Sequence, residues 1–201
     1  MHSAQKPVAG RAVVAIVMAA AAAAGCANSG KAPSSTPAPL PGPGAMTGPS
    51  PAQATDYSGL LIKPNDLGAD FVAAQPPVLN PNNTSGVSQF FINADKSRRV
   101  GDSIQIVADP ATAVVGVDNT KTNYGGKVSG AWQPVDVGSN GVIISGVSPD
   151  NSQSMTVLLF TEGRALVDLE FDGAPDDPID PAVATDIGRK QDAAIKSGLH
   201  S

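Results

Sequence analysis

The stretch SMTVLLFTEGRALVDLEFD, residues 154–172, decides the fold of this chain. It opens with an apolar run, SMTVLLFT, and Glu162-Gly163 then makes a tight connection to a second segment. In that segment apolar residues at positions 165, 167, 169 and 171 face one way, and Leu166, Asp168 and Glu170 face the other. This alternation predicts antiparallel strands, the second with one buried face and one solvated face.

Further strands and two helices are predicted around this stretch. Asp109-Pro110 and Asp180-Pro181 each place an N-cap aspartate before a proline, which predicts helices over 110–124 and 181–197. Residues 71–83 contain three prolines and are predicted to form a loop. Strand character is found at 86–93, 100–108, 128–137 and 141–148. The order ββ-α-βββ-α predicts an α+β fold, with an antiparallel sheet of about five strands and two helices packed on one side.

The first 25 residues have the layout of an export signal. Lys6 and Arg11 precede a run of 13 residues, 12–24, without a charged or polar side chain. A permanent membrane helix needs about 20 apolar residues, so this run is too short to span and is typical of a cleaved signal peptide.

The end of this signal resembles the bacterial lipobox. Ala23, Ala24 and Gly25 are small residues that lead directly to Cys26, the one cysteine of the chain. The resemblance implies cleavage before Cys26, S-diacylglyceryl and N-palmitoyl groups on that residue, and anchoring at the extracytoplasmic face of the cell membrane. The alternative is ordinary signal cleavage that leaves a free thiol.

Residues 26–55 are predicted to be a tether. Positions 27–55 hold seven prolines among Gly, Ser, Ala and Thr residues, a composition that does not bury apolar surface and is expected to be disordered. Serines and threonines beside the prolines leave open a glycosylated stalk in place of a plain linker. Residues 56–201 have the mixed composition of a single globular domain.

Composition excludes several classes of function. The formal charge is −5, and it becomes −7 when Lys6 and Arg11 are removed with the signal, so the mature chain has no electrostatic basis for binding nucleic acid. The two histidines, His2 and His200, stand at the extremes of the chain. Neither can serve as the base of a Ser-His-Asp or Cys-His arrangement or complete a zinc site, so we expect neither an enzyme nor a cofactor.

Acidic residues supply two candidate sites. Asp172, Asp176, Asp177 and Asp180 lie between the last strand and the last helix and could hold calcium, although their spacing is not that of an EF-hand. The alternative is a solvated loop that ends in a helix cap. Asp168 and Glu170 could form the carboxylate pair of a glycosidase, or simply be the wet side of an amphipathic strand.

Aromatic and basic residues supply two more candidates. Trp132, the one tryptophan, could line a small-molecule pocket with Tyr124, or both could pack where helix and sheet meet. Arg98 and Arg99 are expected to be solvated, and in an acidic domain they could also mark a point of contact.

Three segments, SRRVGD at 97–102, VLLFTEGR at 157–164 and GRKQDAA at 188–194, carry a resemblance to a known group. With the element order and the lipobox they resemble small lipoproteins of mycobacteria and related actinobacteria. The resemblance implies either a Mog1/PsbP-like α+β fold or a fold like the extracellular sensor domains of receptor kinases. Sensor-type relatives usually carry disulfides, which one cysteine cannot form, so the Mog1/PsbP-like fold, or a divergent branch, is favoured.

Two functions follow as expectations. The first is a non-enzymatic binding or accessory domain, held to the membrane by its lipid, that engages an envelope protein or glycan. The alternative is a carrier or sensor that holds a lipid or a small apolar ligand between helix and sheet. Carriage requires a large internal apolar cavity, whereas partner binding requires an exposed apolar patch.

Overall fold

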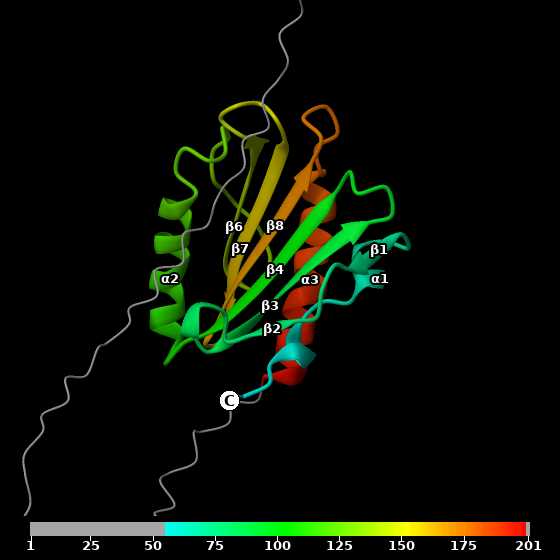
Figure 1. Ribbon diagram of the computed structural model, residues 1–201. Helices are drawn as coiled ribbons and strands as arrows, with labels where there is room; N and C mark the ends of the chain where they lie inside the picture. Colours follow the sequence, from blue (N-terminus) through cyan, green and yellow to red (C-terminus); the bar gives the residue numbers. More distant parts are fainter. Residues whose placement is uncertain (1–54, 200–201) are drawn as a thin grey trace, which may run out of the picture. The chain divides into compact units, whose positions relative to one another are not determined.

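The computed structural model describes residues 55–199 (Figure 1). The predicted signal peptide, the lipobox at Ala23–Gly25, Cys26 and almost the whole predicted tether lie outside these residues and stay predictions. Within 55–199, none of the helices combines the length and the apolar composition needed to cross a membrane.

One antiparallel sheet of eight strands forms the centre of the domain. Its order is β1-β3-β4-β8-β7-β6-β5, with β2 also paired to β3. The α+β class and the antiparallel sheet are therefore confirmed. The strands are β1 Phe71–Ala73, β2 Val78–Leu79, β3 Gly86–Asn93, β4 Arg99–Ile106, β5 Gln133–Pro134, β6 Ser139–Val147, β7 Ser154–Glu162 and β8 Ala165–Gly173; the helices are α1 Pro64–Leu67, α2 Pro110–Asn123 and α3 Pro181–Gly198, with 3-10 turns η1 Ser58–Leu60 and η2 Pro81–Asn83.

Both long helices begin where the Asp-Pro pairs predict. The Asp109 carboxylate accepts a hydrogen bond from the Thr112 backbone N–H at 2.8 Å at the start of α2. The Asp180 carboxylate accepts one from the Ala182 N–H at 2.8 Å at the start of α3. Each cap satisfies a backbone donor that the helix itself leaves without a partner.

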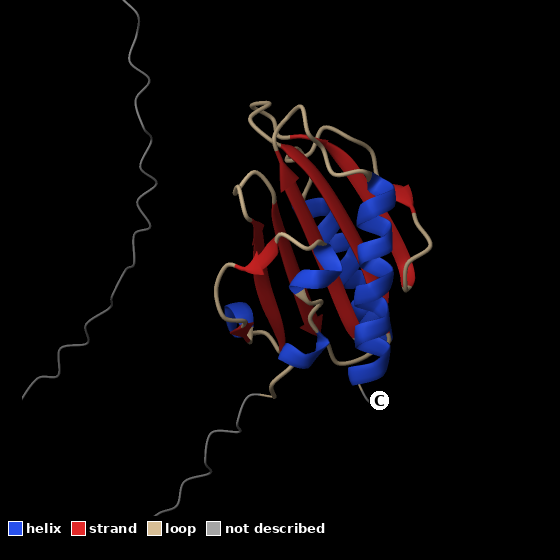
Figure 2. Cartoon of the chain, turned by 90° about the vertical axis from the view of Figure 1, so that its right-hand side faces the viewer, coloured by secondary structure: helices blue, strands red, loops and turns tan. Residues whose placement is uncertain are grey.

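The helices lie on opposite faces of the sheet, so the prediction that they pack on one side is wrong (Figures 1 and 2). Leu158 and Leu159 are neighbours on β7 and point to opposite faces: Leu158 packs in the cluster that contains α3, and Leu159 in the cluster that contains α2. The physical reason is the apolar run of β7, in which both faces are buried and each needs a cover.

Close approach of the helices leaves little space beside the sheet. Gly188 of α3 lies directly against the Leu158 side chain, and Gly116 of α2 lies against Leu166. A Cβ at either glycine would collide with the leucine. Both helices therefore sit on the sheet at the distance that only glycine permits.

The strand count of about five was too low, mainly because of the short edge strands. Residues 71–83, expected as a loop, contain β1 and β2, which pair with opposite ends of β3 on the same side. At the other edge, the predicted strand 128–137 is reduced to β5, which pairs with β6 through Gln133 and Pro134. Edge strands tolerate proline because one row of their backbone groups needs no partner, so prolines conceal such strands in a sequence.

Candidate functional site

Half of the sheet face on the α2 side has no helix over it. Helix α2 packs on β7 and β8, whereas the same face of β1 to β4 is left without a helix (Figure 1). Register places Val72 beside Ile92 on β3, Val78 beside Ser88, and Phe90 beside Gly101 on β4. We call this region, the α2-side face of β1, β2, β3 and β4, the open face.

A shallow groove of about 320 Å³ runs between the open face and the end of α2. Phe90 forms one side and is 52% exposed, and its ring lies against Gly101, where a side chain on the neighbouring strand would press on it. Tyr124, which follows α2, forms another side. The lining is completed by Pro81, Asn82, Ser88, Gln89, Asp102, Ser103, Asp168 and Glu170.

Three polar groups from α2 and β8 meet in this groove. The Tyr124 hydroxyl lies 2.7 Å from Glu170 Oε2 and 3.1 and 3.2 Å from the two Asp168 carboxyl oxygens. Burial, and then the neighbouring Glu170 charge, raise the pKa of Asp168 to about 7. Burial and the two acidic neighbours also raise the pKa of Tyr124. Near neutral pH the hydroxyl can thus donate to Glu170 while it accepts from a protonated Asp168.

This arrangement corrects the prediction of a solvated face on β8. Leu166 is buried under α2, and Asp168 and Glu170 are only partly exposed. Both carboxyl groups are engaged by the same hydroxyl, which ties the end of α2 to the sheet. The geometry therefore supports a structural hydrogen-bond network better than a glycosidase pair.

Tyr124 and Trp132 come together as packing residues. Their rings meet edge to face, with centroids 6.3 Å apart and an interplanar angle of 69°. Both belong to the apolar cluster under α2, and the Lys127 ammonium lies 5.5 Å from the centre of the tyrosine ring. The helix–sheet packing interpretation is the one that the structure supports.

The four candidate calcium ligands do not converge. Asp180 caps α3, while Asp172 and Asp177 pair with arginines from the β3–β4 hairpin. Asp176 is exposed. Among residues 55–199 there is no group of three or more His, Cys, Asp or Glu side chains placed to hold a metal ion.

Arg98 and Arg99 are the partners of those two aspartates. Arg98 donates to both oxygens of Asp177, at 2.6 and 3.1 Å, and Arg99 donates to Asp172 at 2.9 Å. These pairs join the β3–β4 hairpin to the β8–α3 connection. Their charges are thus matched within the domain instead of being free for a partner.

The face under α3 contains a buried polar cluster that sequence reasoning missed. The Gln191 side chain is fully buried; its amide nitrogen donates to the Leu60 carbonyl at 2.6 Å and its oxygen accepts from the Ile62 N–H at 2.9 Å. The same N–H lies 3.3 Å from Asp102 Oδ2. Burial raises the pKa of Asp102 to about 8, and its Oδ1 has no hydrogen-bond partner among the described residues. This cluster fastens the segment 60–62 to the core.

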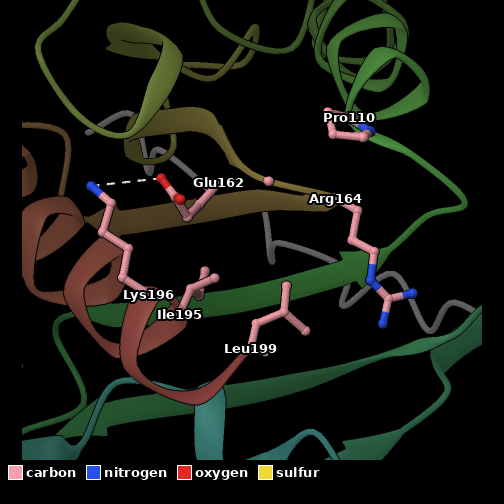
Figure 3. Close-up of a pocket in the computed structure, with 7 residues that line it drawn as sticks. Pro110, Glu162, Arg164, Ile195, Lys196 and Leu199 are labelled. Carbon is pink, nitrogen blue, oxygen red and sulfur yellow. Dashed lines mark ion pairs between the residues drawn. The ribbon is translucent and has the colours of Figure 1, made fainter. Parts of the chain in front are cut away.

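A second hollow, of about 410 Å³, lies at the end of the sheet where α3 ends and α2 begins (Figure 3). Its residues are Pro110, Glu162, Gly163, Arg164, Ile195, Lys196 and Leu199. We call it the end pocket. Ile195 lies on α3, Leu199 directly follows this helix, and the Lys196 ammonium faces Glu162 at 3.6 Å. Sequence reasoning missed it because its walls come from three segments far apart in the chain.

Comparison with known proteins finds a similarity at the level of the fold. No family model matches the chain, and no curated protein matches it. The fold is similar to the extracellular domain of PknH from Mycobacterium tuberculosis, at 12% sequence identity and a TM-score of 0.44, over 69% of this chain and 94% of that one. The choice between a Mog1/PsbP-like fold and a fold like the extracellular sensor domains of receptor kinases stays a prediction.

Proposed function

We propose that this chain is a membrane-tethered, non-enzymatic binding domain that works outside the cytoplasm and contacts a partner protein through its open face. The export signal and lipobox supply the location and the anchor at Cys26. The tether supplies distance from the bilayer. The described domain supplies the contact surface.

The observation that carries the proposal is where exposed apolar side chains gather. Seven large apolar residues are exposed within 55–199, and four of them, Val72, Val78, Leu79 and Phe90, belong to β1, β2 and β3. Register places Val72, Val78 and Phe90 on the open face. Single exposed apolar residues are ordinary, but a group of them on the uncovered half of a sheet is typical of an interaction surface.

Charge indicates the chemistry of the partner. The described domain holds all 18 acidic residues of the chain and ten of its 13 basic residues, a formal charge of −8. Asp168 and Glu170 lie in the groove beside Phe90. A matching partner surface has an apolar centre, which meets Phe90, and a basic rim, which suits the net negative charge of the domain.

Contact through the face is favoured over pairing with a sheet edge. Pro76 and Pro77 interrupt the edge formed by β1 and β2, and β5 at the opposite edge is two residues long and contains Pro134. Short, proline-bearing edge strands hinder addition of another strand.

Site-specific photo-crosslinking in the native envelope tests this function. A photoreactive residue at Phe90 is expected to trap a distinct protein, whereas the same group at Val183, which is 49% exposed on α3, traps none. The Phe90 product should vanish when Val72 is changed to Asp. Equal products from both positions, or a product that survives V72D, would reject the open face as the contact. A product with the mass of two copies of this chain would show self-association instead of a separate partner.

The anchor has its own test. Intact mass of the protein extracted from its native envelope should show a chain that begins at Cys26 with a diacylglyceryl group, with or without an additional acyl chain. An unmodified Cys26 would remove the lipid anchor from the proposal and leave the open face untouched.

Carriage of a small apolar ligand remains a second candidate, and one feature favours it. The helices lie too close to the sheet for a large cavity in the interior, as Gly116 and Gly188 show. The end pocket, at about 410 Å³, is within the size range of sites for small molecules.

A further inference from the structure

We infer that the end pocket binds a small monocarboxylate with an apolar chain, whose carboxylate pairs with Arg164. The pocket shares no residue with the groove of the open face. The inference deepens the second candidate function and is independent of the partner contact. Each can fail without the other.

Arg164 differs from the other arginines of the domain. Arg98, Arg99 and Arg189 each donate to an aspartate at 2.6–3.1 Å. Within residues 55–199, Arg164 is the arginine that forms no ion pair, although the domain has eight more acidic than basic residues. A guanidinium left without a carboxylate in so acidic a domain is available for one from a ligand.

The position of Arg164 is fixed by the backbone. It follows Gly163 at the β7–β8 turn, and its carbonyl accepts a hydrogen bond from the Val107 N–H at 3.0 Å. Its side chain extends away from the Glu162–Lys196 ion pair and lines both the end pocket and a neighbouring hollow (Figure 3). A ligand in the end pocket therefore meets the Arg164 side chain as part of the pocket lining.

The rest of the lining suits an apolar chain and argues against a cationic ligand. Pro110, Ile195 and Leu199 offer carbon surface between the charged groups. The two acids nearest to the pocket are occupied, because Lys196 pairs with Glu162 at 3.6 Å and with Asp192 at 2.6 Å. An amine would have to displace that lysine, whereas a carboxylate would meet a guanidinium that forms no ion pair within residues 55–199.

The volume of the end pocket limits the length of the ligand. A pocket of about 410 Å³ lies near the lower end of the range for small-molecule sites, roughly 300–1,000 Å³, and it is open to solvent on one side. It therefore suits a chain of medium length, of which octanoate is a convenient probe. Octanol and octylamine are matched probes that share the chain and differ in the polar group.

Photolabelling of the full chain in nanodiscs tests this inference. Diazirine-bearing octanoate should label peptides that contain Pro110 or Leu199, and R164Q should lower that labelling about tenfold, as expected for loss of one charge-assisted pair. R164K should retain part of it. R189Q removes a paired arginine of α3 and should leave labelling unchanged. An unchanged thermal transition would show that R164Q remains folded.

Three results would overturn the inference. Octanol or octylamine could label the pocket as strongly as octanoate, which would remove the role of the carboxylate. R164Q could label as wild type does, which would remove the role of Arg164. Octanoate could label the open face in place of the end pocket, which would move the site. The first two results have no bearing on crosslinking from Phe90.

Discussion

The two faces of the sheet are covered to different extents. Helix α3 and the segment 60–62 close one face, and even its polar groups, Asp102 and Gln191, are sealed inside. Helix α2 packs mainly on β7 and β8 on the other face and leaves Phe90 and Val72 more than half exposed. The difference supports the proposal that the α3 face holds the fold together while the open face recognises another molecule.

The largest expected effect is a pH dependence of the stability, caused by the acid buried on the α3 face. Asp102 has a folded pKa of about 8 against an ordinary value of 3.8, so between pH 4 and pH 8 the folded chain keeps a proton that the unfolded chain has lost. Stability must therefore fall as pH rises through this window, by as much as several kcal/mol. Asp168, with a pKa of about 7, contributes in the same direction. Urea denaturation at pH 5, 7 and 9 measures the fall.

The variant D102N should flatten this dependence because its amide does not ionise. D150N is the matched control: the Asp150 carboxylate accepts hydrogen bonds from Ser148 and Ser152, which lower its pKa to about 2, so it is ionised throughout the range. If D102N and wild type lose the same stability between pH 5 and pH 9, Asp102 is not the buried acid described.

The next largest effect is expected from truncation of an apolar side chain, and the loss of stability should differ between the two faces of the sheet. Leu158 is fully buried against α3, and L158A should cost about 3 kcal/mol in the free energy of unfolding, because it removes buried carbon and leaves a cavity. F90A on the open face should cost below about 1 kcal/mol, although it removes a larger group. Denaturant titration of both variants gives the comparison, and equal losses would mean that the open face belongs to the core.

Loss of the Gln191 amide should have a smaller effect. Q191A leaves the Leu60 carbonyl without its buried donor, which is expected to cost about 2 kcal/mol. Hydrogen exchange should speed up at Leu61 and Ile62 before it does in β7. R189A, at an exposed neighbouring position, serves as the control. If R189A destabilises the protein as much as Q191A, the buried hydrogen bonds of Gln191 are not what holds the segment 60–62.

Local signals made the regular elements predictable. Asp109 and Asp180 begin the two long helices as their Asp-Pro pairs predict, and residues 154–172 form the predicted antiparallel pair. The apolar run of β7 does not alternate, and this pattern indicates a strand with both faces covered, unlike the alternating β8 beside it.

Non-local contacts account for what sequence reasoning missed. The β1 and β2 strands form because β3 provides a pairing partner, whereas the prolines at 76, 77 and 81 that flank them predict a loop. Gln191 contacts Leu60, which lies 131 residues earlier in the chain. Whether Arg164 has a carboxylate partner among residues 55–199 depends on how three distant segments end around the end pocket. The extent of the open face is set by which strands α2 covers, and this follows from the order of the strands in the sheet and not from any local pattern in the sequence.

Carbene footprinting of the protein in its native envelope, compared with the purified chain, tests the central claim most directly. If the open face contacts a partner, labelling of Val72, Val78 and Phe90 should fall several-fold in the envelope, while Val115 on α2 and Val183 on α3, which are exposed to a similar extent, stay as reactive as before. Equal labelling of Phe90 in both samples, or protection confined to Val115 or Val183, would contradict the claim that the open face is the binding surface.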